Sequence, residues 1–382
     1  MKIIADENIP FAREAFGTLG DVTLVHGRAL SAGQVAGADL LFVRSITKVN
    51  AALLDGTPVR FVGTATAGTD HVDVEYLARR GIAFAAAPGC NANSVAEYMA
   101  AAWLVLARRK GLTLRGMKAG IIGVGNVGSR VEKKARALGM EPVLNDPPLA
   151  RTTGDSKYRP FDEVFDCDII TCHTPLTRDG EDPTYQLANA AFFARVKQGT
   201  IFCNAGRGEV VDEAALRRTM RSDKLRAVVL DVWDHEPSIA PDLLGKVDLG
   251  SPHVAGYSYD GKIGGTTQVY EAACKFLGIA PKWRAKKAML APEFPELTAD
   301  AGGRLDEAVL LEVVTRVYPI ERDDANLRAT IPMTPEDRGK AFDRLRKEYP
   351  YRREFSNTRL WLRDGSDRLL TSAKGLGFDV AP

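Results

Sequence analysis

The sequence lacks the features that mark membrane, secreted and nucleic-acid-binding proteins. It has no run of 18 or more apolar residues, so no membrane-spanning helix is expected. Its first residues, MKIIADENIP, have neither the basic nor the apolar segment of a signal peptide. The 51 lysines and arginines nearly balance the 49 aspartates and glutamates, and no long basic run occurs. The charge pattern therefore argues against a nucleic-acid or membrane-surface partner.

Cysteine is also scarce, with five residues scattered along 382. No two of them form a CxxC pair, so the sequence predicts neither a zinc site nor a disulfide framework. We expect reduced, mostly buried thiols in a cytoplasmic protein that holds no metal. The cysteines are Cys90, Cys167, Cys172, Cys203 and Cys274.

The most informative stretch that is present covers residues 112–146. An apolar run, Ala119–Val124, leads into three glycines, and a helical pattern with an apolar residue every three or four positions follows. Gly123 permits a tight turn, Gly125 lets the backbone approach a pyrophosphate, and Gly128 lets the helix pack close to the strand. The helix N-terminus then offers amides and a positive dipole end to phosphates.

An acid completes this pattern. Asp146 follows Gly128 by 18 residues, near the spacing of about 20 expected of the acid that binds the adenosine ribose. A carboxylate there repels a 2′-phosphate, so NAD is favoured over NADP. The alternative is a glycine-rich turn in another kind of α/β unit. Strand, turn, helix and acid together favour dinucleotide binding.

The order of apolar runs and helical patterns predicts three domains. Residues 1–93 alternate short buried strands with helices and, with residues 271–283, form a small parallel α/β domain. Residues 94–270 form the NAD-binding domain and begin with an apolar helix, Ser94–Lys110, in which Asn93 or Ser94 and Glu97 fit a capping box. Residues 284–382 form the third domain and are rich in charge and helix. Residues 282–295 are predicted to be a linker that overlaps its start. The predicted fold class is α/β, with two Rossmann-like doubly wound parallel sheets and a small C-terminal α+β domain that serves assembly.

Three side chains at successive strand ends carry the predicted chemistry. His253 is the candidate acid/base, because an imidazole exchanges protons near neutral pH. Glu236, 17 residues earlier, is the candidate that orients it. Arg207, between two glycines, is the candidate holder of a substrate carboxylate. Each of the three alone has an ordinary structural explanation, such as a turn or a helix cap. Together, after a nucleotide fingerprint, they favour hydride transfer to or from a 2-hydroxy acid.

These residues give the chain a resemblance to a known family, the D-isomer-specific 2-hydroxyacid dehydrogenases. The family pattern is Arg, Glu and His, in that order, after GxGxxG, and the resemblance runs over residues 1–280. It is carried by ADENIP at 5–10, VRSITKV at 43–49, GTATAGTDHVD at 63–73, APGCNA at 87–92, NDPP at 145–148, HTPLT at 173–177, NAGRGEVVD at 204–212, LDVW at 230–233 and SPHVAGYS at 251–258.

The resemblance implies a role for each matching residue. It makes Arg207, Glu236 and His253 the catalytic residues, with His253 as the proton donor. It assigns substrate binding to Ser45, Thr66 and Tyr257. It assigns contacts with NAD to the glycine loop and to strand ends; these residues are Gly123, Gly125, Asn126, Val127, Gly128, Asp146, Thr174, Ala205, Asp231 and Gly256.

The same resemblance implies a small phosphorylated 2-hydroxy acid as substrate and a homodimer formed through the C-terminal domain. The phosphate needs donors of its own, and Arg44, Lys48 and Lys262, with an arginine of the C-terminal domain, are the candidates. Two alternatives stay open. One is a related dehydrogenase, such as one acting on 3-phosphoglycerate. The other is a non-catalytic NAD-sensing protein on this fold, which would retain the same three residues.

Overall fold

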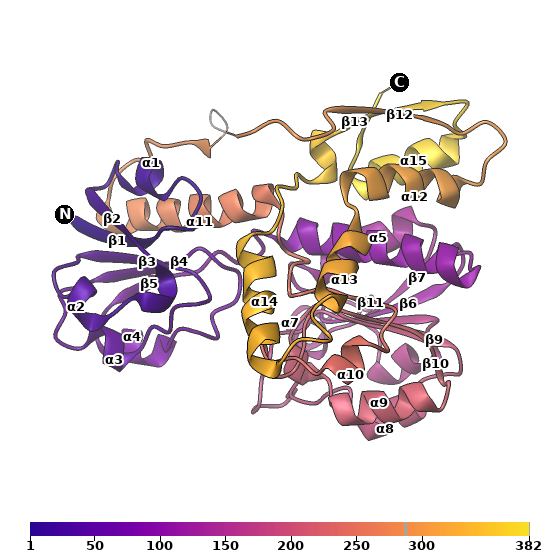
Figure 1. Ribbon diagram of the computed structural model, residues 1–382, viewed down its shortest axis with the longest axis horizontal. Coiled ribbons are helices and arrows are strands. Elements are labelled where there is room, and N and C mark those ends of the chain that lie inside the picture. Colours follow the sequence, from indigo (N-terminus) through magenta and orange to yellow (C-terminus); the bar gives the residue numbers. More distant parts are fainter. Residues whose placement is uncertain (286–288, 382) are drawn as a thin grey trace. The chain divides into compact units, whose positions relative to one another are not determined.

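The computed structural model describes residues 1–285 and 289–381. The chain divides into two compact units, each built around a parallel sheet (Figure 1). Unit 1 comprises Met1–Asn91 and Ser258–Ala291, and unit 2 comprises Ala92–Tyr257 and Pro292–Pro382, without the few residues outside the described ranges. The predicted linker at 282–295 lies partly outside those ranges, at residues 286–288.

Unit 1 is a five-stranded parallel sheet in the order β2-β1-β3-β4-β5. Its strands are short and apolar, as expected of strands buried on both faces. They are β1 (Lys2–Asp6), β2 (Asp21–Val25), β3 (Leu40–Val43), β4 (Phe61–Thr64) and β5 (Ala83–Ala85). The helices are α1 (Ala12–Phe16), α2 (Ala32–Val35), α3 (Ala51–Leu54), α4 (Val74–Arg79) and the long α11 (Tyr259–Leu277).

Unit 2 contains a six-stranded parallel sheet in the order β11-β10-β9-β8-β6-β7. The order reverses between β6 and β8, which is the position where doubly wound sheets bind nucleotides. The strands are β6 (Lys118–Ile122), β7 (Glu141–Asn145), β8 (Ile169–Cys172), β9 (Thr200–Asn204), β10 (Leu225–Leu230) and β11 (Leu249–Gly250). The helices are α5 (Ala92–Lys110), α6 (Gly128–Ala137), α7 (Pro147–Thr153), α8 (Ala190–Arg195), α9 (Glu213–Arg221) and α10 (Pro241–Leu244).

Alternate residues of these strands enter two separate cores, because successive side chains of a strand point to opposite faces. Ile201 and Cys203 of β9 join the core that includes α5 and α6. Phe202, between them, joins the core that includes Phe192 and Phe193 of α8. Both faces of the sheet are thus covered, as the apolar strands predicted.

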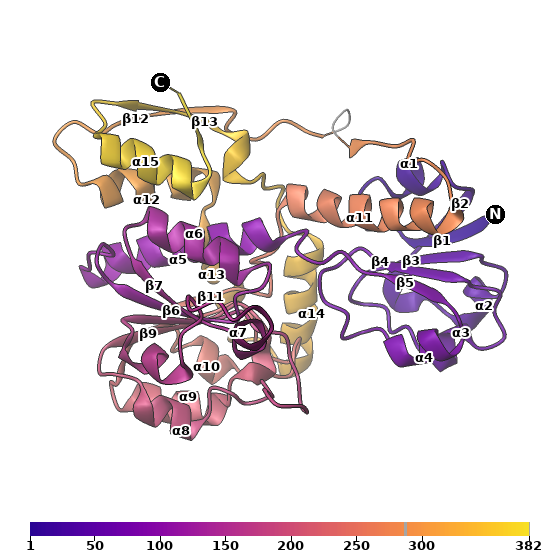
Figure 2. The ribbon, with the colours of Figure 1, turned by 180° about the vertical axis from the view of Figure 1, so that it is seen from behind.

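The C-terminal segment, residues 292–381, extends unit 2. It contains β12 (Glu296–Asp300), α12 (Asp306–Val317), α13 (Ile320–Arg328), α14 (Pro335–Lys347), β13 (Arg359–Arg363), α15 (Asp367–Leu376) and β14 (Asp379–Val380). Its three strands form a parallel sheet in the order β12-β13-β14. Figures 1 and 2 show α12 and α15 between this sheet and the helices α5 and α6. The fold class predicted from the sequence is confirmed.

Two predicted boundaries differ from the structure. The chain was expected to return to the first domain at residue 271, but α11 is one unbroken helix that belongs wholly to unit 1. The C-terminal segment was expected to form a domain of its own. Its buried residues, such as Val309, Leu360 and Leu369, instead join the same apolar core as α5. A shared core makes the segment part of unit 2.

The predicted capping box of α5 is wrong. The helix begins at Ala92, so Ser94 and Glu97 lie inside it. The Ser94 hydroxyl donates to Glu354 (2.7 Å), and Glu97 accepts from the Phe355 amide (2.9 Å). Burial, together with the charge of Glu354, raises the pKa of Glu97 to about 8. Tertiary contacts with the C-terminal segment therefore replace the local cap that the sequence pattern suggested.

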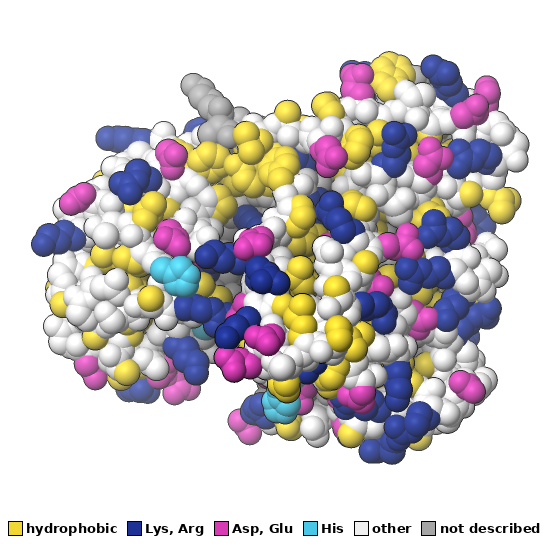
Figure 3. Space-filling view, viewed as in Figure 1, with side chains coloured by type: hydrophobic (Ala, Val, Ile, Leu, Met, Phe, Trp, Pro, Cys, Tyr) yellow, Lys and Arg dark blue, Asp and Glu magenta, His cyan; other side chains and the backbone are white. Residues whose placement is uncertain are grey.

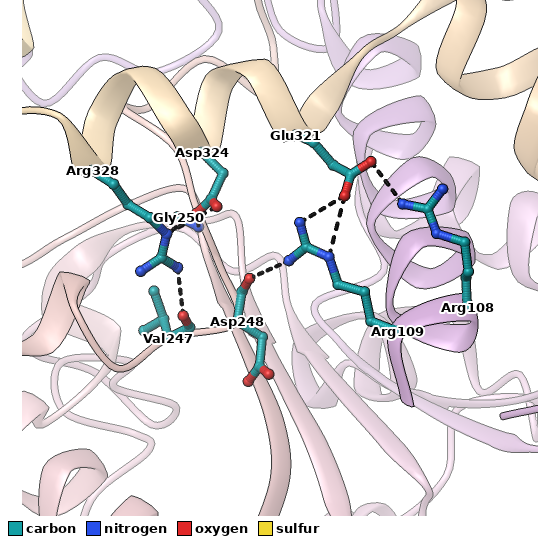
Figure 4. Close-up of polar contacts among 8 residues, drawn as sticks. All are labelled: Arg108, Arg109, Val247, Asp248, Gly250, Glu321, Asp324 and Arg328. Carbon is teal, nitrogen blue, oxygen red and sulfur yellow. Dashed lines mark hydrogen bonds and ion pairs between the residues drawn. The ribbon is translucent and has the colours of Figure 1, made fainter. Parts of the chain in front are cut away.

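The edge strand β11 is only two residues long, and helix α13 covers it (Figure 4). The Gly250 amide donates to Asp324 (2.7 Å), and Arg328 donates to the carbonyl groups of Leu244 and Val247. Asp324 and Arg328 also form an ion pair at 2.9 Å. Asp324 thus satisfies an amide of the edge strand, and Arg328 fixes the segment that leads into it.

Several expected absences can be compared with the part of the chain that the structure describes. No helix there is long and apolar enough to cross a membrane. No group of three or more His, Cys, Asp or Glu side chains there could hold a metal ion. The five cysteines are free thiols, and four of them are buried. The face drawn in Figure 3 carries interspersed acidic and basic side chains, without a large area of one sign.

The α13 contact makes a stability prediction. Asp324→Ala would leave the buried Gly250 amide without its acceptor, so we expect the free energy of unfolding to fall by about 2 kcal/mol. Lys340→Ala, which removes an exposed ion pair with Glu336, is the control and should change it by less than about 0.5 kcal/mol. Denaturant unfolding of both variants measures the difference. Equal effects would show that α13 does not support the sheet edge.

Candidate active site

The carboxyl ends of the six strands in unit 2 lie level with one another. Register pairs Asn145 of β7 with Ile122 of β6, which pairs with Cys172 of β8. The row continues through Asn204 of β9 and Leu230 of β10, which pairs with Gly250 of β11. Every site residue predicted in this unit follows one of these strand ends within a few positions. Parallel strands in register therefore gather these residues along one edge of the sheet.

The glycine turn has the geometry that a pyrophosphate requires. Gly123 has φ 84°, and a Cβ on Gly128 would lie 1.9 Å from the Gly123 carbonyl oxygen, so only glycine fits there. Gly125 is different, because a Cβ at that position would meet nothing within 4 Å. Within the described chain, the amides of Gly125, Asn126 and Val127 donate to no protein acceptor. Open space and free amides before helix α6 suit an anion.

The Asp146 carboxylate supports this turn from within the protein. One oxygen accepts from the Val124 amide of the turn (2.8 Å), and the other accepts from Leu149 and caps α7 (3.0 Å). Each carboxylate oxygen has a second lone pair with which to meet a ribose hydroxyl. The predicted ribose contact stays a prediction, and the structure adds a role in fixing the glycine turn.

The loop after β8 faces the same turn. A Cβ on Gly123 would lie 2.9 Å from the Thr174 amide nitrogen, so the two loops are in close contact. The Thr174 hydroxyl oxygen is buried and has no hydrogen-bond partner among the described residues. A buried hydroxyl without a partner is unusual in proteins and is consistent with an absent ligand.

Arg207 follows β9 and Ala205 in a partly buried loop. Its guanidinium donates to the Gly206 carbonyl (2.9 Å), and its own carbonyl accepts from Asn204 (2.8 Å). A Cβ on Gly208 would overlap the Trp233 carbonyl at 1.9 Å, which brings this loop against the chain just before Glu236. The planar guanidinium has five donors in a fork that matches the two oxygens of a carboxylate.

Glu236 and His253 form the pair that the sequence predicted. The His253 Nδ1 lies 2.7 Å from the Glu236 Oε2, and the other Glu236 oxygen accepts from the Trp233 amide (2.9 Å). Burial raises the pKa of Glu236, but the charge and hydrogen bond of His253 and the charge of Arg346 outweigh it, so the pKa is lowered overall. The carboxylate is therefore ionised near neutral pH. It fixes the imidazole through Nδ1, which leaves Nε2 for a substrate hydroxyl.

The backbone at His253 is in the left-handed region, with φ 58°. Such a conformation is uncommon for a residue other than glycine and is found most often at functional sites. Asp231 maintains it. The Asp231 carboxylate is buried and accepts from the Ser251 hydroxyl and the amides of Val254 and Ala255, at 2.7 to 3.1 Å. Burial raises the pKa of Asp231, although these bonds oppose the shift. Its expected contact with NAD stays a prediction, whereas its hold on the catalytic loop is visible.

The predicted substrate residues are divided between the units. In unit 1, Ser45 and Thr66 follow β3 and β4, whose ends pair at Val43 and Thr64. The Thr66 hydroxyl donates to the Gly68 carbonyl (3.0 Å). Ser45 is exposed. In unit 2, Tyr257 and Gly256 follow His253 and are partly buried.

The structure also locates the phosphate candidates and the remaining histidines. Arg44 lies 3.3 Å from Asp6, which weakens it as a phosphate ligand, whereas Lys48 is exposed. Burial lowers the pKa of His173 to about 3, and His235 is exposed over 85% of its side chain. The His173 imidazole is therefore neutral near pH 7, and His235 is a surface residue.

The sequence predicted an arginine of the C-terminal domain near the site but did not identify which one, and it gave helix α14 no role. Arg346 lies with its guanidinium carbon 5.8 Å from the centre of the Tyr257 ring, and its charge lowers the pKa of Glu236. The only signal in the sequence was an arginine in a charged helix, which has many exposed counterparts. Its neighbours become visible only in the fold.

The fold and site define an NAD-dependent dehydrogenase of 2-hydroxy acids, and comparison with known families agrees. Residues 91–255 match the family described as "D-isomer specific 2-hydroxyacid dehydrogenase, NAD binding domain". Residues 290–375 match a domain of unknown function, DUF3410. The cofactor is NAD. The contacts of the glycine turn, Thr174 and Asp146 with it stay predictions.

Curated relatives give a narrower family. Erythronate-4-phosphate dehydrogenase of Edwardsiella ictaluri is 47% identical over 381 residues, which cover 100% of this chain and 99% of the relative. The enzyme of the same name from Marinobacter nauticus is 44% identical over 384 residues, with 100% of both chains covered. The chain belongs to the erythronate-4-phosphate dehydrogenase family.

Solved structures resemble a smaller share of the chain. An NAD-bound 3-phosphoglycerate dehydrogenase of Entamoeba histolytica has a TM-score of 0.62 at 25% identity and covers 73% of this chain and 95% of its own. D-lactate dehydrogenase of Aquifex aeolicus, solved with NAD and lactic acid, has a TM-score of 0.60 at 23% identity, with 73% and 96% covered. The second likeness shows the fold alone.

Two glycine substitutions should separate cofactor binding from folding. Gly125→Ala adds a methyl group to open space, so we expect normal thermal unfolding but NADH binding weakened about tenfold, or about 1.4 kcal/mol. Gly128→Ala places the same group against the Gly123 carbonyl and should lower the unfolding temperature itself. Fluorescence titration with NADH and thermal unfolding distinguish the two. If Gly125→Ala binds NADH as tightly as the wild type does, the glycine turn does not bind the pyrophosphate.

Proposed function

We propose that the protein oxidises 4-phospho-D-erythronate to (R)-3-hydroxy-2-oxo-4-phosphooxybutanoate with NAD, a step of pyridoxal 5′-phosphate (vitamin B6) biosynthesis. The observation that supports this reaction is the 2.7 Å contact between Glu236 and His253, on the same sheet edge as the glycine turn. The substrate follows from full-length relatives at 44–47% identity that bear this enzyme's name.

Each residue of the site has one task in this reaction. Arg207 holds the substrate carboxylate through its guanidinium fork. His253 takes the proton of the 2-hydroxyl on Nε2, while Glu236 keeps the imidazole oriented and stabilises its charged form. NAD, when bound, accepts the hydride from C2. The left-handed backbone at His253, held by Asp231, fixes the imidazole before the substrate arrives.

The substrate is tested with a panel of 2-hydroxy acids and identification of the oxo acid by mass. We expect turnover of 4-phosphoerythronate at a kcat/KM at least about tenfold above that of 3-phosphoglycerate. His253→Ala should remove at least about 99% of turnover, because general acid–base catalysis contributes roughly a hundredfold or more, and should leave NADH binding unchanged.

Three results would contradict this proposal. A preference for 3-phosphoglycerate would assign the chain to a different dehydrogenase. No turnover of any acid, with NADH still bound, would favour the NAD-sensing alternative. Unchanged turnover in His253→Ala would remove the mechanism.

We further propose that the chain forms a homodimer through the C-terminal sheet. Leu297, Ala299 and Leu360 point inward and are buried, so the opposite face of β12 and β13 is open. Trp361 lies on that face and is 39% exposed. Around it, register pairs glutamate with arginine and aspartate with arginine, at Glu296–Arg359 and Asp300–Arg363. A charge-balanced face with a central aromatic side chain suits a self-complementary twofold contact.

Trp361→Glu should therefore convert a dimer into a monomer, because it buries a charge at the centre of the contact. Light scattering measures the mass. Val74→Glu, which changes a comparably exposed apolar residue in unit 1, is the control and should leave the dimer intact. A dimer that survives Trp361→Glu would place the interface elsewhere.

A cytoplasmic location completes the proposal and is supported by the five free thiols.

A further inference from the structure

The C-terminal segment contacts both loops that carry the catalytic pair. On the Glu236 side, α14 packs on Pro237, where a methyl group added to Gly339 would lie 3.8 Å from the proline side chain. On the His253 side, the ring of Tyr349 lies edge-on to that of Tyr257, 5.6 Å between centres. The Arg352 guanidinium also donates to the Ala255 carbonyl (3.3 Å). The C-terminal segment therefore contacts the loop of Glu236 and the loop of His253.

Arg346 of α14 is the charged side chain at the centre of these contacts. Its guanidinium carbon lies 5.8 Å from the ring centre of Tyr257 and 5.9 Å from that of Phe342, both within cation–π range. Its Nε is buried and has no acceptor in the described ranges. Burial lowers the pKa of Arg346, but Tyr257 and Glu236 outweigh it and raise the pKa above its usual value. A partly buried guanidinium in this position compensates the charge of the Glu236 carboxylate.

We propose that Arg346 is a positioning residue for the Glu236–His253 pair, so that the C-terminal segment is part of the active centre as well as a candidate for assembly. The inference rests on the proposed dehydrogenase function. Arg346 compensates the buried Glu236 carboxylate and packs on Tyr257, the residue that ends the His253 loop. It thereby holds the two partners of the pair from one helix.

The physical need for such a residue follows from burial. A carboxylate removed from water is costly unless charge and hydrogen bonds compensate it. Trp233 supplies one bond to Glu236 and His253 supplies the other. Once His253 is neutral, its compensating charge is gone, whereas the positive charge of Arg346 still lowers the pKa of Glu236. Arg346 therefore keeps the carboxylate ionised in the protonation state that must accept the substrate's proton.

A substrate-binding role for Arg346 is the competing explanation, since the substrate carries a phosphate. The two roles differ in what they change. Loss of a phosphate ligand raises KM and leaves the titration of the pair alone. Loss of a positioning cation lowers kcat and moves the acidic limb of the pH profile upward, because Glu236 then becomes protonated at a higher pH.

The test compares Arg346→Met, Arg346→Lys and the control Arg344→Met in the full-length protein. Arg344 lies on the same helix and is exposed, so its loss removes a charge without touching the pair. Kinetics as a function of pH are measured with the 2-hydroxy acid that the wild type turns over best. We expect Arg346→Met to lower kcat about tenfold or more and to shift the acidic limb upward by about one pH unit. Arg346→Lys should return the acidic limb most of the way to its wild-type pH. The affinity for NADH should stay unchanged in all three variants.

Three results would overturn the inference. Arg346→Met behaving like Arg344→Met would mean that Arg346 does not act on the pair. A raised KM with an unchanged pH profile would make it a substrate ligand. A lowered unfolding temperature with an unchanged pH profile would make its role structural. Failure of the proposed substrate appears separately, in the wild-type panel, and leaves this comparison intact for whichever 2-hydroxy acid is oxidised.

Discussion

The active site depends on one buried carboxylate, that of Asp231. It accepts hydrogen bonds from Ser251, Val254 and Ala255, which lie on both sides of His253. These bonds keep His253 in a left-handed backbone conformation that the chain would not otherwise favour. The position of the imidazole relative to Glu236 therefore follows from a group that touches neither of them.

The same carboxylate begins a polar chain into the C-terminal segment. The Ser251 hydroxyl donates to Asp231 and lies 2.8 Å from the Tyr98 hydroxyl of α5, whose ring is 6.2 Å from that of Tyr318. The hydroxyl groups of Tyr318 and Tyr349 both donate to Asp323 (2.9 and 2.8 Å). Buried networks of this kind fix one arrangement of their members.

Sequence patterns predicted both parallel sheets and the contact between Glu236 and His253, because each depends on local signals. Apolar runs mark buried strands, and the pair lies just beyond two of them. Patterns could not predict the partner of Glu97. It lies inside α5 and accepts a hydrogen bond from the amide of Phe355, 258 residues away. Nor could they distinguish Arg346 from the exposed Arg344, since only tertiary contacts separate the two. Both of these features depend on long-range contacts of the C-terminal segment.

The short edge strand β11 has a consequence for how the chain is made. Its Gly250 amide is satisfied by Asp324, a residue 74 positions later in the chain. During synthesis the nucleotide-binding sheet therefore emerges from the ribosome with one edge bare, directly beside the histidine loop. That edge stays available to other strands until α13 has been translated. A helix that braces the finished enzyme thus also determines how long the nascent chain is exposed to mispairing.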